Sequence, residues 1–97
     1  MSVEYIKKLQ KAHELFTKKH EFRVGDIVEW KPGMENRVSK GPFVVVEILP
    51  EIVMNTEESA GITYFREPLD IVLGQIDEEG DFIFFHYDSR RIQPFGG

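Results

Sequence analysis

The stretch FRVGDIVEWKPG at residues 22–33, followed after a short and mostly polar segment by KGPFVVVEIL at residues 40–49, decides the fold. A Gly-Asp pair makes a bulge or turn at the start of an apolar strand, and a Pro-Gly pair ends that strand. A Gly-Pro pair then opens a second strand, which is rich in β-branched residues. Two strands arranged in this way predict the beginning of a small β-barrel, and they say little about activity.

The β-pattern continues after this opening, with turn residues between short apolar runs. We expect strands at 24–31, 43–49, 62–66, 69–76, 82–87 and 91–95. Residues 77–81 form a hairpin turn, and residues 88–91 form one 3₁₀ turn with Asp88 as its cap. Five or six short strands predict a mainly β fold, either a small antiparallel barrel or a strongly bent sheet.

An amphipathic helix is predicted before the first strand. Ser2 caps residues 3–19, and apolar side chains recur every three or four positions at Val3, Ile6, Leu9, Ala12 or His13, and Phe16. A lone helix of this length is marginal in water, so the apolar stripe must be buried. Burial on the chain's own sheet is the favoured interpretation, and burial in a dimer is the alternative. The 97 residues then form one domain, with the helix in 1–21 and the barrel in 22–97.

The strand at 82–87 is apolar on both faces. Side chains alternate along a strand, so Phe82, Phe84 and His86 point one way and the other three point the opposite way. A barrel wall normally shows one face to solvent, so this strand needs a second cover. We expect the N-terminal helix to supply it, with Ile6, Leu9 and Phe16 packed over this strand or its neighbour.

Composition bounds the class of protein. Hydrophobic residues make up 41% of the chain, and no apolar run approaches the roughly 20 residues that span a bilayer. We therefore expect no membrane segment, and the charged N-terminus does not resemble a signal peptide. The chain has no cysteine, which removes disulfides, thiolate chemistry and cysteine-bound zinc. A cytoplasmic location is the expectation.

Charge is distributed unevenly along the chain. Residues 1–23 hold six Lys or Arg and three Glu, a net charge of +3, whereas residues 24–97 hold six Lys or Arg and fourteen Asp or Glu, a net charge of −8. The favoured interpretation is that both are solvated faces, or that the basic arm docks on its own acidic body. The alternative is that the arm meets an acidic partner.

The two ends of the β-region resemble those of known barrels. The pattern Gly25-Asp-x-Val28, with Lys31-Pro-Gly33 and the β-branched run after Gly41, resembles the opening hairpin of SH3-like barrels and the KOW-type motif of ribosomal and transcription-elongation proteins. It is also similar to small bacterial proteins of unknown function, and residues 88–95 resemble the closing turn and strand of the same barrels. The resemblance implies a fold and no activity. The chain departs from KOW proteins in being acidic.

The candidate catalytic and metal-binding residues have simpler structural roles. His86 and Asp88 share a strand face and would need a third metal ligand such as Asp70 or Asp77, so we favour a partly buried histidine and a capping aspartate. No Gly-x-Ser-x-Gly elbow or phosphate-binding loop is present, and Ser59 stands in a polar loop. The sequence therefore predicts neither an enzyme nor a cofactor or metal site.

A protein-interaction module is the favoured function, with another copy of the chain as one candidate partner. We expect its binding surface around the loops 31–42 and 50–60 and at the chain's two paired arginines, because Trp, Arg and Met are enriched among interface anchors. The predicted surface comprises Trp30, Lys31, Met34, Arg37, Arg90 and Arg91. A single tryptophan on a strand is more often part of a core.

Nucleic-acid binding is the alternative function. It would use a basic patch formed by Lys7, Lys11, Lys18 and Arg23, extended by Arg90 and Arg91 if these lie on the same side. A continuous positive face would favour this alternative, and scattered charges would weaken it. The net charge of −5 opposes it.

Overall fold

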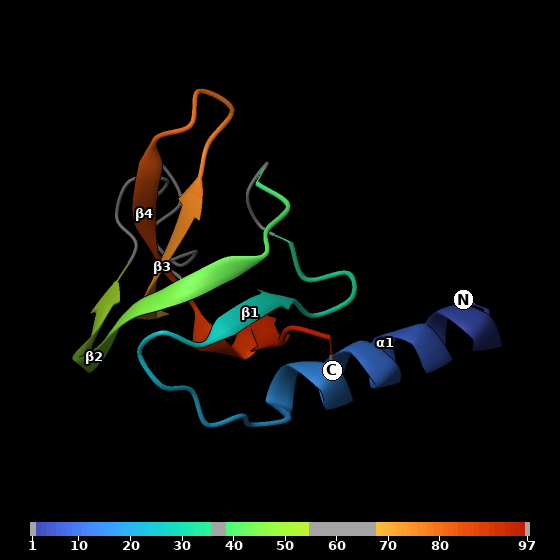
Figure 1. Ribbon diagram of the computed structural model, residues 1–97. Coiled ribbons are helices and arrows are strands. Elements are labelled where there is room, and N and C mark those ends of the chain that lie inside the picture. Colours follow the sequence, from blue (N-terminus) through green and yellow to red (C-terminus); the bar gives the residue numbers. More distant parts are fainter. Residues whose placement is uncertain (1, 36–38, 55–67, 97) are drawn as a thin grey trace, which may run out of the picture.

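A computed structural model describes residues 2–35, 39–54 and 68–96 (Figure 1). The elements are α1 (Val3–Thr17), β1 (Ile27–Trp30), β2 (Phe43–Met54), β3 (Pro68–Ile76), β4 (Phe82–Tyr87), the 3₁₀ helix η1 (Ser89–Arg91) and β5 (Ile92–Pro94). The mainly β class with an N-terminal helix is confirmed. The expected strand at 62–66 lies outside the described residues.

The strands form one antiparallel sheet in the order β4-β3-β2-β1-β5. The register of β2 on β3 shifts twice, between Val45 and Glu47 and between Ile48 and Val53. Such irregularities bend a strand, and β2 turns sharply along its length (Figure 1). Within the described residues no ladder joins β4 to β5, so the sheet is bent but the expected barrel is not closed. The three- and four-residue strands β5 and β1 offer little length for closure.

The core lies on the concave side of this sheet. Trp30, Phe43 and Tyr87 form an aromatic trio with ring centroids 5.3 to 5.6 Å apart. Aliphatic side chains from β1, β2, β3 and β5 pack around the trio: Val28, Val45, Ile71, Leu73 and Ile92. Phe22, in the segment between α1 and β1, covers this core from outside the sheet.

The helix begins as predicted but does not cover β4. The Ser2 side chain accepts a hydrogen bond from the Tyr5 amide at 3.1 Å. The C-terminal end of α1 lies against η1, and the N-terminal half projects away from the sheet (Figure 1). Ile6 and Leu9 are exposed, and only Leu15 and Phe16 are half-buried. The prediction that Ile6 and Leu9 pack over strand 82–87 is therefore wrong.

The last turn of α1 is held by two residues, Lys31 directly after β1 and Arg90 in η1 after β4. The aromatic ring of Phe16 lies under the guanidinium of Arg90, 4.6 Å from the ring centroid. This contact sets the direction in which the helix leaves the sheet. Within the described residues, no helix is both long and apolar enough to span a membrane.

Candidate functional site

Trp30, the predicted aromatic anchor, belongs to the core. Its side chain is buried among Phe43 and Tyr87, and its indole N–H donates to the Ser39 carbonyl at 2.9 Å. The hydrogen bond satisfies the one polar group of the ring. Trp30 therefore offers little exposed surface, and the expectation that a single tryptophan on a strand belongs to the core applies here.

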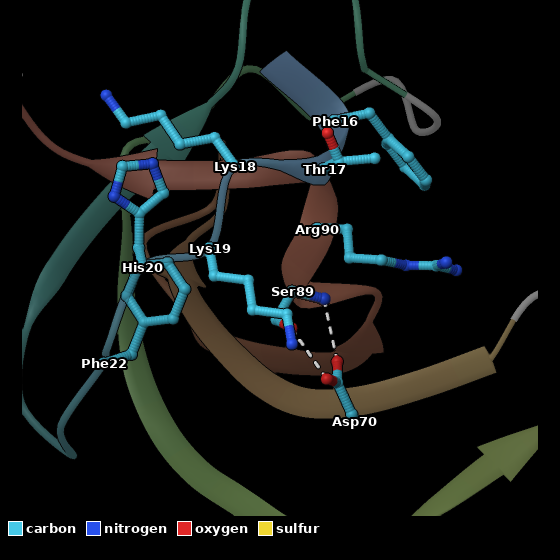
Figure 2. A pocket seen from close by; sticks show the side chains of 9 residues that line it. All are labelled: Phe16, Thr17, Lys18, Lys19, His20, Phe22, Asp70, Ser89 and Arg90. Atoms are coloured by element: carbon cyan, nitrogen blue, oxygen red, sulfur yellow. Dashed lines mark hydrogen bonds between the residues drawn. The ribbon is translucent and has the colours of Figure 1, made fainter. Parts of the chain in front are cut away.

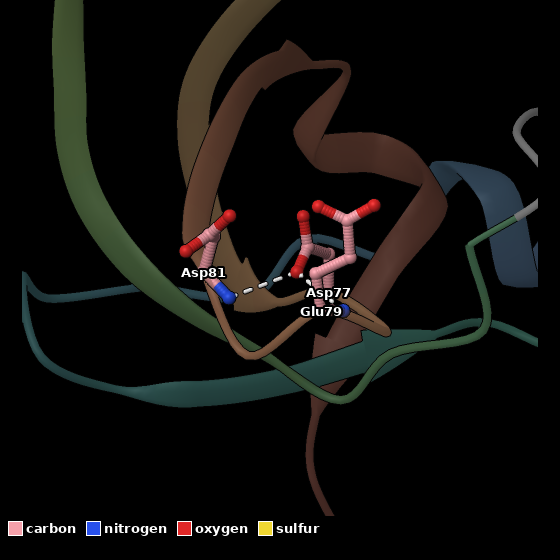
Figure 3. Close-up of side chains that lie close together, drawn as sticks. All are labelled: Asp77, Glu79 and Asp81. Atoms are coloured by element: carbon pink, nitrogen blue, oxygen red, sulfur yellow. Dashed lines mark hydrogen bonds between the residues drawn. The ribbon is translucent and has the colours of Figure 1, made fainter.

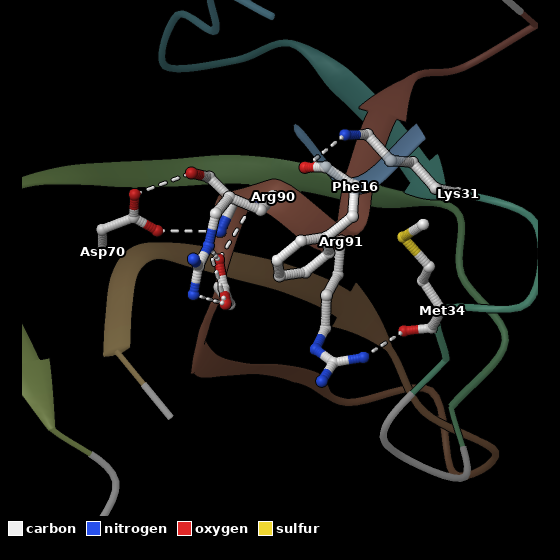
Figure 4. Close-up of polar contacts among 8 residues, drawn as sticks. Phe16, Lys31, Met34, Asp70, Arg90 and Arg91 are labelled. Carbon is white, nitrogen blue, oxygen red and sulfur yellow. Dashed lines mark hydrogen bonds and ion pairs between the residues drawn. The ribbon is translucent and has the colours of Figure 1, made fainter. Parts of the chain in front are cut away.

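Lys31 is buried as well, with 1% of its surface exposed. Its ammonium donates to three main-chain carbonyl oxygens at the end of α1: those of Leu15, of Phe16 at 3.4 Å and of Lys18 at 2.9 Å. Figure 4 shows the bond to Phe16. The last carbonyls of a helix have no partner within it, and they lie at the negative end of its dipole. Lys31 therefore fastens α1 to β1, and the prediction that it forms part of an exposed binding surface is wrong.

Burial of this ammonium has an electrostatic consequence. Desolvation lowers the pKa of Lys31 below its ordinary value, the carboxylate of Asp88 opposes that change, and the charge of Lys18 adds to it. A buried charge is tolerated when hydrogen bonds replace its water. The three carbonyl groups provide that replacement.

Met34, Arg90 and Arg91 make contacts within the chain. Met34 is buried, and its carbonyl accepts from the Arg91 guanidinium at 3.1 Å (Figure 4). Arg90 holds Asp88 through both carboxylate oxygens, with the closest N–O distance 2.7 Å. Arg37 lies outside the described residues. The part of this surface that the structure describes is thus mainly a set of internal contacts rather than a free patch.

A hollow of about 430 Å³ lies beside these contacts, beneath the C-terminal end of α1 (Figure 2). Its lining residues come from α1, the following segment, β3 and η1: Phe16, Thr17, Lys18, Lys19, His20, Phe22, Asp70, Ser89 and Arg90. Asp70 accepts from both the amide and the hydroxyl of Ser89, at 2.8 and 2.6 Å. Its carboxylate is therefore engaged with η1.

His20 lines this hollow between cations. Burial lowers the pKa of His20 below its ordinary value of 6.5, and the charges of Lys31 and Lys18 lower it further. A neutral imidazole at pH 7 follows from all three causes. Nothing in the sequence singles out His20, because Asp70 and Ser89, which line the same hollow, are distant from it along the chain.

The alternative basic patch is interrupted. Lys7, Lys11 and Lys18 follow one side of α1 by helical spacing, but Glu14 falls on the same side between them. Arg23 stands in the turn before β1, where its amide donates to Asp26. Lys18 and Arg90 do line the same hollow, where they are joined by Lys19 and by the carboxylate of Asp70.

An exposed apolar surface lies at the other end of the molecule. We call it the hairpin face, and it comprises Ile76, Phe82 and Phe84 on the outer side of β3 and β4. Ile76 is paired with Phe82 in register, and Phe84 follows two residues later, so the three share one side. They are 63%, 53% and 58% exposed.

The rings of the hairpin face lie close to each other and to the backbone of β3. Phe82 and Phe84 have ring centroids 6.2 Å apart. The ring of Phe82 lies directly over Gly74, in space that a Cβ at that position would occupy. Because Gly74 has no side chain, the aromatic ring covers the backbone of β3.

The turn that ends the hairpin face is acidic. Asp77 accepts from the amides of Glu79 and Asp81 at 2.9 and 2.8 Å, and the three carboxylates lie close together (Figure 3). These hydrogen bonds shape the turn and explain the cluster without an ion. Of the other pair considered as metal ligands, Asp88 is buried and caps η1 as predicted, whereas His86 is exposed rather than partly buried.

Comparisons with known proteins identify no relative of this chain. No family model matches the chain, and neither curated proteins nor solved structures include a significant match.

Proposed function

We propose that this protein is a non-enzymatic protein-interaction module and that the hairpin face is its binding surface. One observation carries the proposal: two aromatic rings stand more than half exposed, side by side, on the edge strand β4. Burying apolar surface stabilises a complex by about 25 cal/mol for each Å² removed from water. Contiguous exposed apolar patches are typical of interaction sites.

The surroundings of the hairpin face support the same role. Aromatic residues are enriched in the cores of interfaces, and polar residues form the rim. The acidic turn at 77–81 supplies such a rim beside Phe82. The outer edge of β4 also carries backbone groups outside any described ladder, and such an edge is a template for pairing with another chain.

The resemblance to SH3-like barrels is part of this proposal. The residues that carry it form a paired β1–β2 opening and a 3₁₀ turn leading into β5, which is what such a fold requires at its two ends. We also propose a cytoplasmic location, which agrees with a chain free of cysteine.

The test is affinity capture from cells of the source organism with a tagged chain. The double variant Phe82→Ser/Phe84→Ser removes the rings, and Phe95→Ser is the matched control, since Phe95 is 56% exposed elsewhere. We expect proteins recovered with the wild type and with Phe95→Ser to be lost with the double variant. Equal recovery with all three would contradict the proposal.

Nucleic-acid binding is the second candidate, because Lys18, Lys19 and Arg90 gather around one hollow (Figure 2). Cations that contact phosphates give binding that weakens with salt. A gel-shift assay at two salt concentrations tests it, with Lys18→Gln/Lys19→Gln as the variant. A shift that is salt-sensitive and lost in the variant supports this candidate, and its absence leaves the interaction module alone.

A further inference from the structure

Among the described residues, two groups of exposed apolar side chains lie on different parts of the molecule. One is the hairpin face. The other is the α1 stripe, which we define as Tyr5, Ile6 and Leu9, with exposed fractions of 49%, 39% and 53%. Phe16 continues this side of the helix, and its ring contacts Arg90 of η1.

We infer that the partner of the hairpin face is a second copy of this chain, whose α1 stripe packs across it. The inference rests on the proposed function and names the occupant of that surface. Each copy would place its helix on the hairpin of the other, so that one two-fold dimer covers four apolar surfaces at once.

The need for a cover is strongest at α1. An isolated helix shorter than about 12 to 15 residues is marginal in water, and α1 has 15 residues with none before Leu15 even half-buried. A helix packed on a sheet is one of the standard layer arrangements of proteins. The lengths also match, because 15 helical residues span about 22 Å and the six residues of β4 span about 20 Å.

The charges of the two surfaces also favour a second copy of this chain as the partner. The segment from α1 to Lys19 holds five lysines against two glutamates, whereas the hairpin turn holds four carboxylates and no cation: Asp77, Glu78, Glu79 and Asp81. Opposite net charges steer the two surfaces together. Lys8 borders the α1 stripe by helical spacing, where it is placed to meet the acidic rim, and Lys7 and Lys11 point away from the stripe.

The first experiment measures molar mass by sedimentation over a hundredfold range of concentration, with the full chain. We expect a monomer–dimer equilibrium that Leu9→Ser or Phe84→Ser each weakens at least about tenfold. Phe95→Ser is the control and leaves it unchanged. A monomer at every concentration, or a dimer that survives both variants, overturns the inference.

The second experiment uses the absence of cysteine to identify the contact. Two differently tagged chains, Leu9→Cys and Phe84→Cys, are mixed and treated with a short bifunctional maleimide. We expect a crosslinked product that contains both tags, and none when Leu9→Cys is mixed with Phe95→Cys. Equal crosslinking in the two mixtures contradicts docking of α1 on the hairpin face.

A charge exchange gives a third readout. Lys8→Glu weakens the dimer, and mixing it with a chain carrying Glu78→Lys/Glu79→Lys restores association between the two. The failures separate cleanly. A monomeric chain whose captured proteins still depend on Phe82 and Phe84 overturns this inference alone, whereas capture that ignores both rings overturns the proposed function too.

Discussion

Beneath the end of α1 the ammonium of Lys31 is buried and held by main-chain carbonyl groups, whereas on the hairpin face the rings of Phe82 and Phe84 stand in solvent. Lys31 is 1% exposed and Phe84 is 58% exposed. The usual preferences of these residue types are reversed at both places. The buried ammonium of Lys31 has its hydrogen-bond partners within the same chain, since main-chain carbonyl groups surround it. The rings of Phe82 and Phe84, by contrast, remain more than half exposed, and the proposed function rests on this difference.

The two regions also differ in what would loosen them. The junction under α1, formed by Lys31, Asp88, Arg90 and Phe16, depends on hydrogen bonds and one ring contact. Its loss would be felt as instability of the monomer. The hairpin face contributes little to the monomer, so its loss would be felt in association. The following substitutions separate the two.

The largest effect is expected at Lys31. In Lys31→Ala the three carbonyls of α1 lose their donor, and a buried stem leaves a cavity, so we expect the free energy of unfolding to fall by about 2 to 3 kcal/mol. Urea denaturation followed by circular dichroism measures it. Lys19→Ala, an exposed neighbour, should stay within about 0.5 kcal/mol. Equal effects of the two variants would contradict the role assigned to Lys31.

Asp88 comes next. The variant Asp88→Ala removes the cap of η1 and the acceptor of Arg90, and we expect a loss of about 1 to 2 kcal/mol. It also takes away the carboxylate that favours a charged Lys31. Asp81→Ala is the matched control, since Asp81 is exposed and contributes its amide to the turn. A thermal melt of both variants decides whether the junction depends on this carboxylate.

The sequence predicted the parts of this architecture that depend on neighbours along the chain. The caps at Ser2 and Asp88, the turn at 77–81 and most strand positions are short-range features, and they were found where the pattern placed them. The burial of Lys31 was not predicted. Its acceptors are main-chain carbonyls 13 to 16 residues away, which carry no side-chain signature.

The sequence predicted the two apolar sides of strand 82–87 but not which of them is exposed. Alternation along 82–87 indicated two apolar sides, and the inner one does hold Tyr87 in the core. The outer side is exposed at Phe82 and Phe84 because α1 leads away from β4, in a direction set by the contacts of Phe16 and Lys31. Long-range contacts of this kind are not encoded in periodicity.

A smaller effect is expected on the hairpin face. In dilute solution Phe84→Ser should change the free energy of unfolding by less than about 1 kcal/mol, because the ring is already exposed. Under the proposed dimer, the effect of this substitution on stability should grow with protein concentration, because it weakens association. Denaturation at two concentrations measures this, and a large loss in the dilute monomer would show that the ring supports the fold itself.

The smallest effect concerns acidity at the hollow. The folded-state pKa of His20 lies below 6.5, so the unfolded chain binds more protons and stability falls as pH drops from 6.5 through the folded value. His20→Gln should remove this part of the acid sensitivity. Melting temperatures of both proteins across that range test it, together with the His20 ring signals in NMR. A His20 midpoint above 6.5 would contradict the burial described here.

The attachment of α1 has a consequence for engineering. Lys31 grips the helix by its main chain, and every helix presents the same carbonyl groups in its last turn. Apart from the aromatic ring at position 16, this attachment therefore depends little on which side chains the helix carries. A different amphipathic helix grafted to end at the same residue should leave the sheet in the same direction. The sheet could therefore serve as a scaffold on which α1 is replaced by other helices.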